Sequence, residues 1–156
     1  MDLPEQLRSL IAYDDWANHK MLACAEGLSD ADLTAAPLAG VRGISDTLAH
    51  ALGTRVWWLS RWKGTEFNMP AVSTPARLRD AHGSVHNELV EYVDSLSANQ
   101  WSQPFEAFGP MIPFSAILSQ VMLHGVQHRA ELATMLSALG RSPGDIDYIF
   151  FMREHA

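Results

Sequence analysis

The stretch Ser115–Leu139, SAILSQVMLHGVQHRAELATMLSAL, decides the fold that we expect for this chain. Its apolar residues recur at steps of three and four, which predicts one long amphipathic helix. Gly140 follows directly and Pro143 comes soon after it, and both are stop signals for a helix. His124 and His128 are four residues apart on the apolar stripe, so we expect both rings to face the interior of a helical bundle.

Three further helices are predicted upstream from the same periodicity and from their terminal residues. The first begins near Pro4 and ends near Gly27, and the second begins with Ser45 as its cap residue and ends near Gly64. The third begins at Ser73 or Thr74, with Pro75 just inside, and its apolar stripe ends at Leu96. Four long helices with little strand predict an all-α fold, a four-helix bundle.

The connections between these helices have their own patterns. Residues 28–43 are rich in Gly, Pro and Ala and are predicted to form a loop. Residues 101–113 contain prolines that forbid a helix, and the Gly109-Pro110 turn predicts a short hairpin of residues 105–108 with 111–112 before the fourth helix. The tail, residues 145–154, is predicted to be a short C-terminal helix with Asp145 as its cap.

Length and composition limit the class of protein. We expect residues 1–156 to form a single domain, with 47% hydrophobic residues to fill one core. The net charge of -7 and the scattered basic residues argue against nucleic acid as a partner. The sequence has no long apolar run and no signal-peptide pattern, so we expect a cytoplasmic protein with no membrane partner. Cys24 is the only cysteine and is interpreted as a small core residue.

The two histidines of the fourth helix suggest a metal site. Unpaired imidazoles in an apolar core each cost about 1–3 kcal/mol, and one transition-metal ion would satisfy both His124 and His128. His50, about two turns into the second helix, is the best candidate for a third ligand. Three histidines with an open fourth position are typical of catalytic rather than structural metal sites. The alternative is a set of core histidines bonded to hydroxyls or carbonyls, and the spacing leaves it open.

Four other histidines are less suited to this role. His82 and His86 also have i, i+4 spacing, but Gly83 and Ser84 beside them favour a solvated flank or a pairing role. His19 and His155 are expected to be solvated. The chain lacks the HExxH pattern of zinc proteases.

Several segments together resemble a known family. They are Tyr13-Asp-Asp-Trp-Ala-Asn18, Ile44-Ser-Asp-Thr-Leu-Ala-His50 followed by Trp57, Leu123-His-Gly-Val-Gln-His-Arg-Ala-Glu131, and Pro143-Gly-Asp-Ile-Asp-Tyr-Ile-Phe-Phe151. With these segments the chain resembles the DinB family, the DinB/YfiT-like metalloenzymes, over nearly its whole length. The His of the second helix combined with HxxxHR on the fourth is the most specific part.

The resemblance implies an antiparallel-type four-helix bundle, of the DinB/YfiT-like type, with an unusual connection. It further implies that the protein is often a homodimer with a link to stress or DNA-damage responses. It also implies a three-His metal site on His50, His124 and His128. The metal would be one divalent transition ion, Zn first, with Ni, Fe and Mn as the others. Relatives with assigned chemistry use low-molecular-weight thiols, as S-transferases or as isomerases of maleylpyruvate. The isomerase branch has a carboxylate in the triad, which this sequence lacks.

Three functions remain open at the level of sequence. The first is a metal-dependent thiol S-transferase acting on a small-molecule substrate, because metal ligation holds a thiol as the reactive thiolate. The second is a metal-dependent hydrolase on the same site, and the third is a non-catalytic metal-binding stress-response bundle. No catalytic side chain is assigned.

Several residues around the triad have candidate secondary roles. Glu131 is either an outer partner of His128 or a surface charge. Arg61 is either a clamp for a cofactor carboxylate or, as we favour, part of an ordinary ion pair. Trp57, Trp58 and Trp62 cannot all face one core, so some should line a pocket or a dimer interface. The residues at helical steps from His50, expected to line the open face, are Asp46, Thr47, Thr54, Trp57 and Arg61.

Overall fold

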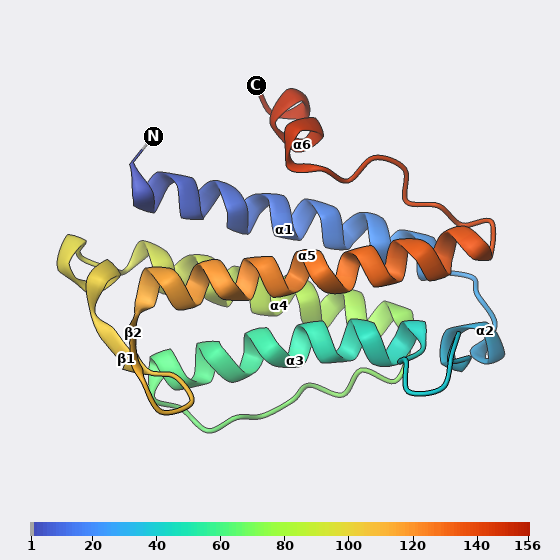
Figure 1. The fold of residues 1–156 in the computed structure, drawn as a ribbon, viewed down its shortest axis with the longest axis horizontal. Helices are drawn as coiled ribbons and strands as arrows, with labels where there is room; N and C mark the ends of the chain where they lie inside the picture. The colour runs from blue at the N-terminus through green and yellow to red at the C-terminus, as the bar shows by residue number, and fades with distance from the viewer. Residues whose placement is uncertain (1) are drawn as a thin grey trace.

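Four long helices make up the body of the molecule. The structure, a computed structural model, describes residues 2–156. Figure 1 shows the long helices lying side by side as a bundle, which confirms the predicted all-α fold. They are α1 (Leu3–Ala25), α3 (Ile44–Lys63), α4 (Pro75–Asp94) and α5 (Phe114–Ala138). The shorter elements are α2 (Asp30–Thr34), a 3₁₀ helix (Ala98–Ser102), β1 (Pro104–Glu106), β2 (Met111–Pro113) and α6 (Tyr148–Glu154).

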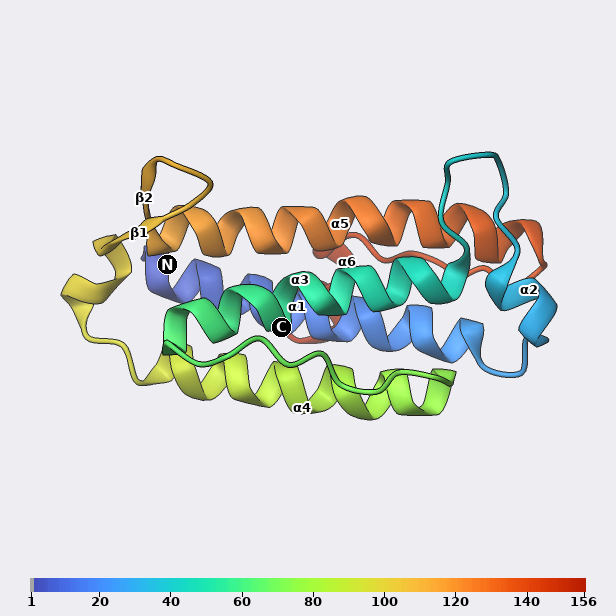
Figure 2. The same ribbon diagram turned by 90° about the horizontal axis from the view of Figure 1, so that it is seen from below.

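The connection between α3 and α4 is long and runs back along the bundle. In Figures 1 and 2, α3 and α4 point in the same direction, and α1 and α5 both point the opposite way. Residues 64–74 therefore return from the end of α3 to the start of α4 along the outside of the bundle. An extended chain rises about 3.3 Å per residue against about 1.5 Å in a helix, so this short segment can match a 20-residue helix. Such a return differs from the short turns that join antiparallel neighbours in a simple bundle.

The helix ends follow local chemistry, with two corrections to the sequence prediction. Gly64 ends α3 in the left-handed region with φ 66°, as a glycine stop should. Ser45 is not the cap of α3: Gly43 is the cap residue, and the Ser45 hydroxyl donates to the Leu33 carbonyl. The cap of α6 is Asp147 and not Asp145.

Two other segments are more structured than predicted. The predicted loop at residues 28–43 contains α2, which Ser29 caps by accepting from the Asp32 amide. The prolines of residues 101–113 do not exclude a 3₁₀ turn around Trp101, because that turn ends before Pro104. The hairpin itself is confirmed, with Phe105 paired to Ile112 in an antiparallel register.

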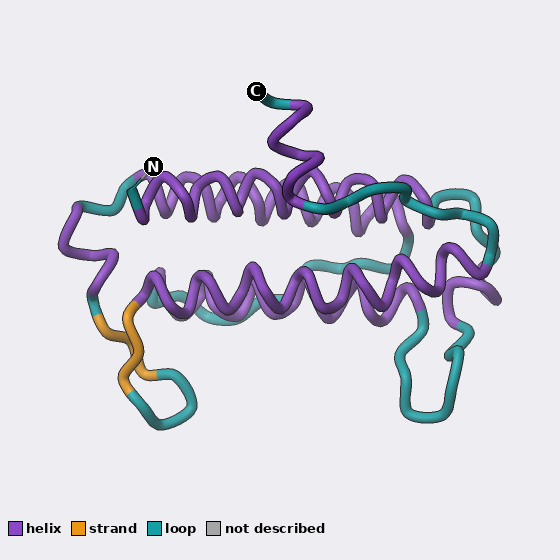
Figure 3. Tube along the Cα trace, turned by 45° about the horizontal axis from the view of Figure 1, so that its top comes forward, coloured by secondary structure: helices purple, strands orange, loops and turns teal. Residues whose placement is uncertain are grey.

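Two loops extend from the same side of the bundle. Figures 2 and 3 show the tip of the β1–β2 hairpin and the loop after α2 projecting in the same direction at opposite ends of the α3 and α5 pair. The C-terminal helix α6 instead packs outside α1, where the rings of Tyr13 and Tyr148 lie 5.3 Å apart. No helix among the described residues is long and apolar enough to cross a membrane.

The two largest apolar clusters of the core are separated by a polar layer. One cluster includes Leu7, Leu59 and Leu118, and the other includes Met21, Leu52 and Leu132. Between them along the chain lie the buried polar side chains Asp14 on α1, Arg55 on α3, His82 on α4 and Arg129 on α5. Each long helix thus contributes to this layer, which we call the polar layer. Asn18 of α1 also belongs to it, through hydrogen bonds with Asp14 and Arg129.

Asp14 is the anion at the centre of the polar layer. Its Oδ2 lies 2.5 Å from Nη2 of Arg55, and its Oδ1 accepts a hydrogen bond from Nη1 of Arg129. Arg55 in turn lies 3.3 Å from Nδ1 of His82. Gly125 leaves the room for this contact, since a Cβ there would lie 2.7 Å from Oδ1 of Asp14. The polar layer therefore joins all four helices through one carboxylate.

Replacing Asp14 by Asn should strongly destabilise the protein. The change leaves the buried guanidinium groups of Arg55 and Arg129 without their counter-charge, and breaking a buried ion pair costs about 3–5 kcal/mol. Urea unfolding would measure this loss. The control is Asp94→Asn, which removes an exposed ion pair with Arg8 and should cost under about 1 kcal/mol. Equal stability of the two variants would contradict a structural role for the polar layer.

The polar layer should also make stability depend on pH through His82. Burial, and then the charge of Arg55, lower the pKa of His82 from 6.5 to about 3. Between these two pH values the unfolded chain binds a proton that the folded chain does not. The free energy of unfolding is therefore highest above pH 6.5 and decreases as the pH falls toward 3. The slope is at most about 1.4 kcal/mol per pH unit.

Urea unfolding of the His82→Gln variant at several pH values tests this dependence. The variant should lose less stability than the wild type between pH 6.5 and 5, whereas the exposed control His19→Gln should follow the wild type. Parallel curves for wild type and His82→Gln would show that His82 ionises freely in the fold.

Candidate metal centre

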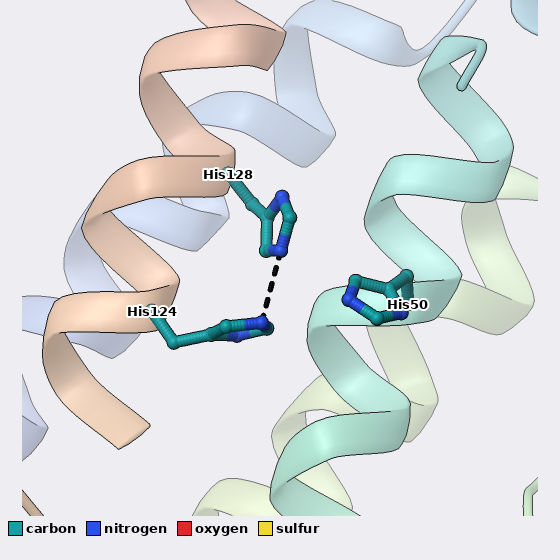
Figure 4. A group of neighbouring side chains, drawn as sticks. All are labelled: His50, His124 and His128. Atoms are coloured by element: carbon teal, nitrogen blue, oxygen red, sulfur yellow. Dashed lines mark hydrogen bonds between the residues drawn. The ribbon is translucent and has the colours of Figure 1, made fainter. Parts of the chain in front are cut away.

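Three histidines from two helices converge in the middle of the bundle. His50 lies on α3, and His124 and His128 lie one turn apart on α5. Figure 4 shows the three rings turned toward a shared point between the two helices. The Nε2 atoms of His124 and His128 are 3.1 Å apart, and each histidine has a ring nitrogen within 4.8 Å of those of the other two.

This geometry suits a single small cation. Zn²⁺ binds imidazole nitrogens at about 2.0–2.1 Å, so two ligands of a tetrahedral ion lie about 3.3 Å apart. The separation between His124 and His128 is close to that value. His50 faces them across the gap, with ring centroids 5.3 Å from His124 and 4.8 Å from His128. The residues present therefore fit a metal with three imidazole ligands.

Glu131 fixes the orientation of one ring. Its Oε2 lies 2.8 Å from Nδ1 of His128, one turn further along α5. A proton on Nδ1 donated to this carboxylate leaves the Nε2 lone pair of His128 free to face the other rings. The hydrogen bond from His128 is also the main cause that lowers the pKa of Glu131. Of the two sequence interpretations, the outer partner is therefore the one that the contact supports.

The local electrostatics favour neutral rings, which are the form that binds metal. Burial, followed by the proximity of His128 and His50, lowers the pKa of His124 from 6.5 to about 4. Burial and the charge of Arg42 lower the pKa of His50. These two rings are thus neutral near pH 7, and no proton has to leave before a cation enters.

An apolar cavity opens directly beside two of the three rings. It has a volume of about 450 Å³, within the range of small-molecule sites, and both His50 and His124 line it. The other side chains of its wall are those of Thr54, Trp57, Trp58, Phe67, Phe108, Gln120 and Val121. Thr54 and Trp57 thus lie where the helical steps from His50 predicted them.

Three of the predicted lining residues lie elsewhere. Thr47 is buried, and its hydroxyl donates to the Gly43 carbonyl. Asp46 is not part of the cavity wall. Arg61 lies 2.8 Å from Oε2 of Glu106 as an ordinary ion pair, which confirms the interpretation that the sequence favoured. Of the three tryptophans, Trp57 and Trp58 line the cavity while Trp62 packs in the core.

The remaining histidines do not join the triad. The prediction that His82 lies on a solvated flank is wrong, because its side chain is 2% exposed and contacts Arg55. His86 is partly buried with Nδ1 3.8 Å from Asp15, and His19 and His155 are exposed as expected. Asp14, Arg55 and Arg129 form the buried network that sequence analysis missed. The buried charged positions on the apolar stripes, such as Asp14 between Leu10 and Ala17, are the signal that could have indicated it.

A helical bundle with a converging three-histidine cluster defines the class of this protein. The model of the DinB family matches residues 3–155, so the chain belongs to the DinB family. Among solved structures, it is similar in fold to the DinB-like protein YjoA of Bacillus subtilis, with a TM-score of 0.64 and 13% sequence identity. That match covers 84% of this chain and 92% of the other. A comparison with curated protein sequences finds no match.

Removing the Glu131 carboxylate should weaken metal binding without removing a ligand. In Glu131→Ala the His128 ring loses the partner that orients it, and loss of such an outer partner lowers metal affinity about 10- to 100-fold. A competition titration of Zn²⁺ against a chromophoric chelator would measure the change. Glu88→Ala, which removes an exposed pair with Lys63, is the matched control. Identical zinc affinities for both variants would argue against this role of Glu131.

Proposed function

We propose that this chain is a metal-dependent enzyme that binds one divalent transition ion through His50, His124 and His128 and transfers a low-molecular-weight thiol to a small-molecule electrophile. The observation that carries the proposal is the convergence of three imidazoles beside an apolar cavity. Zn²⁺ is the first metal to test, because three neutral ligands and an open fourth position are typical of its catalytic sites.

The bound metal would supply a site at which a thiol is held as its thiolate near neutral pH. The chain's own residues would prepare this site. Glu131 accepts the Nδ1 proton of His128 and thereby keeps Nε2 available. Two of the ligand rings are held neutral by burial, so they bind without first releasing a proton.

The chain itself offers no thiol at the site. Cys24, the only cysteine, lies on α1 and packs against the apolar cluster of Met21 and Leu52. The nucleophile must then come from a bound molecule. Arg42 is exposed, and its positive charge reaches His50, His124 and Glu131. It is placed to attract the carboxylates that thiols such as glutathione carry.

Replacing His124 by Ala should remove both the metal and the activity. Elemental analysis should find about one metal ion per wild-type chain, as a single three-ligand site requires, and much less in His124→Ala. With glutathione, bacillithiol or mycothiol and 1-chloro-2,4-dinitrobenzene, the wild type should form the thioether and chloride in a metal-dependent reaction. The exposed control His19→Ala should keep the metal and the rate.

The outcomes separate the parts of this proposal. Equal metal content in His124→Ala and wild type would overturn the triad as the metal site. Metal binding without thiol-dependent turnover would overturn the transferase activity and leave the metal site. A melting temperature that falls in His124→Ala, with no activity to lose, would indicate a structural metal.

A further inference from the structure

Among residues 2–156, the side chains that line the cavity beside the triad include aromatic rings and no charged group. Trp57, Trp58, Phe67 and Phe108 provide four rings. Besides the two histidines and the indole N–H groups of the tryptophans, the polar groups of the wall are the side chains of Thr54 and Gln120. A carboxylate group entering this space would lose its hydration without gaining a counter-charge from the wall, which is costly. The wall therefore selects against anionic groups.

The outer wall is an aromatic pair that the hairpin holds in place. Phe108 lies at the hairpin tip with its ring stacked on Trp57, at 5.5 Å between centroids and 11° between planes. Phe108 is nevertheless 83% exposed, and its backbone has a φ of 56° in the left-handed region. A bulky residue in that region is rare, and such outliers are common at functional sites. The exposed face of the Phe108 ring is therefore available to a ligand.

Contacts near the tip of the hairpin support the position of this ring. The carboxylate of Glu106 accepts from the Gly109 amide at 2.6 Å and pairs with Arg61 of α3 at 2.8 Å. The guanidinium of Arg61 lies 5.0 Å from the centre of the Trp57 ring. One ion pair thus connects Glu106, two residues before Phe108, to the helix that carries Trp57 and His50. This contact favours one position of the aromatic wall relative to the triad.

The wall offers a hydrogen-bonding partner to a neutral substituent of a ligand. The Thr54 hydroxyl donates to the His50 carbonyl at 3.2 Å, so its proton is already used. The side-chain amide of Gln120 makes no hydrogen bond with another described side chain or backbone group and remains available at the wall. A ligand group in this cavity can therefore be apolar and flat with one neutral polar substituent.

We propose that the cavity binds an uncharged, planar aromatic group of the substrate, packed against Trp57 and Phe108 with a substituent that bonds to Gln120. The proposal deepens the proposed function, on which its catalytic meaning rests, because it names the class of electrophile that is held beside the metal ligands. Binding of the aromatic group depends on the cavity wall alone, so it can be measured with and without metal.

The test is equilibrium binding of 2-naphthol and of its charged analogue 2-naphthoate to zinc-loaded and to chelator-treated protein. Tryptophan fluorescence and calorimetry measure the binding. In the chelator-treated protein 2-naphthoate should bind at least about tenfold more weakly than 2-naphthol. Phe108→Ala should weaken 2-naphthol about tenfold by removing one aromatic contact, and Phe67→Ala should weaken it as well. Both residues are exposed, so these variants should fold.

The matched control is Met111→Ala, an exposed apolar residue of the same hairpin that does not line the cavity. It should bind 2-naphthol as the wild type does. Equal binding by Phe108→Ala and Met111→Ala, or tighter binding of 2-naphthoate without metal, would overturn the proposal. A dimer interface at Phe108 would also overturn it. In that case the wild type would be a dimer that does not bind 2-naphthol, and Phe108→Ala would dissociate into monomers. A third outcome is that the wild type binds no zinc but binds 2-naphthol, and that the variants change this binding as expected. It would support the aromatic site and overturn only the metal-dependent function.

Discussion

The ion pairs of Asp14 with Arg55 and Arg129 are the constraint on which the rest of the structure depends. Apolar clusters above and below tolerate small sliding of the helices, because leucine and methionine side chains repack. A carboxylate between two guanidinium groups does not tolerate such sliding, because a shift of one helical turn, about 5.4 Å, would leave buried charges unpaired. The polar layer therefore selects one register for α1, α3 and α5.

That register also determines whether the histidine cluster exists. His50 and Arg55 lie on the same helix, and His128 directly precedes Arg129 in the sequence. When Asp14 aligns Arg55 with Arg129, it aligns His50 with His124 and His128 on the other side of the same two helices. Gly125, between the two histidines, provides the space for the Asp14 contact. The ion pairs of Asp14 thus hold α3 against α5, and the histidine cluster needs no further interaction to do so.

The sequence could predict the parts of this arrangement that rest on local periodicity. The four long helices follow from apolar stripes, with a glycine stop after three of them. The i, i+4 spacing places His124 and His128 on one face. His50 was selected from its position on a helix and from a family resemblance. The polar layer was missed because Asp14 and Arg129 are 115 residues apart, and no local pattern pairs them. His82 was misplaced for the same reason, since its partner Arg55 lies on another helix.

The surroundings of the triad differ sharply between its two sides, and this asymmetry limits the chemistry that the site can perform. On one side the wall is uncharged and aromatic, while on the other the charge of Arg42 reaches His50 and the carboxylate of Glu131 contacts His128. Three neutral imidazoles leave the full charge of a dication uncompensated, whereas a carboxylate ligand would reduce it. With such an ion bound, as proposed, an anionic group would be stabilised at the centre and a neutral one in the cavity. A reaction between an anionic nucleophile and an uncharged apolar electrophile matches this division better than one between two charged partners.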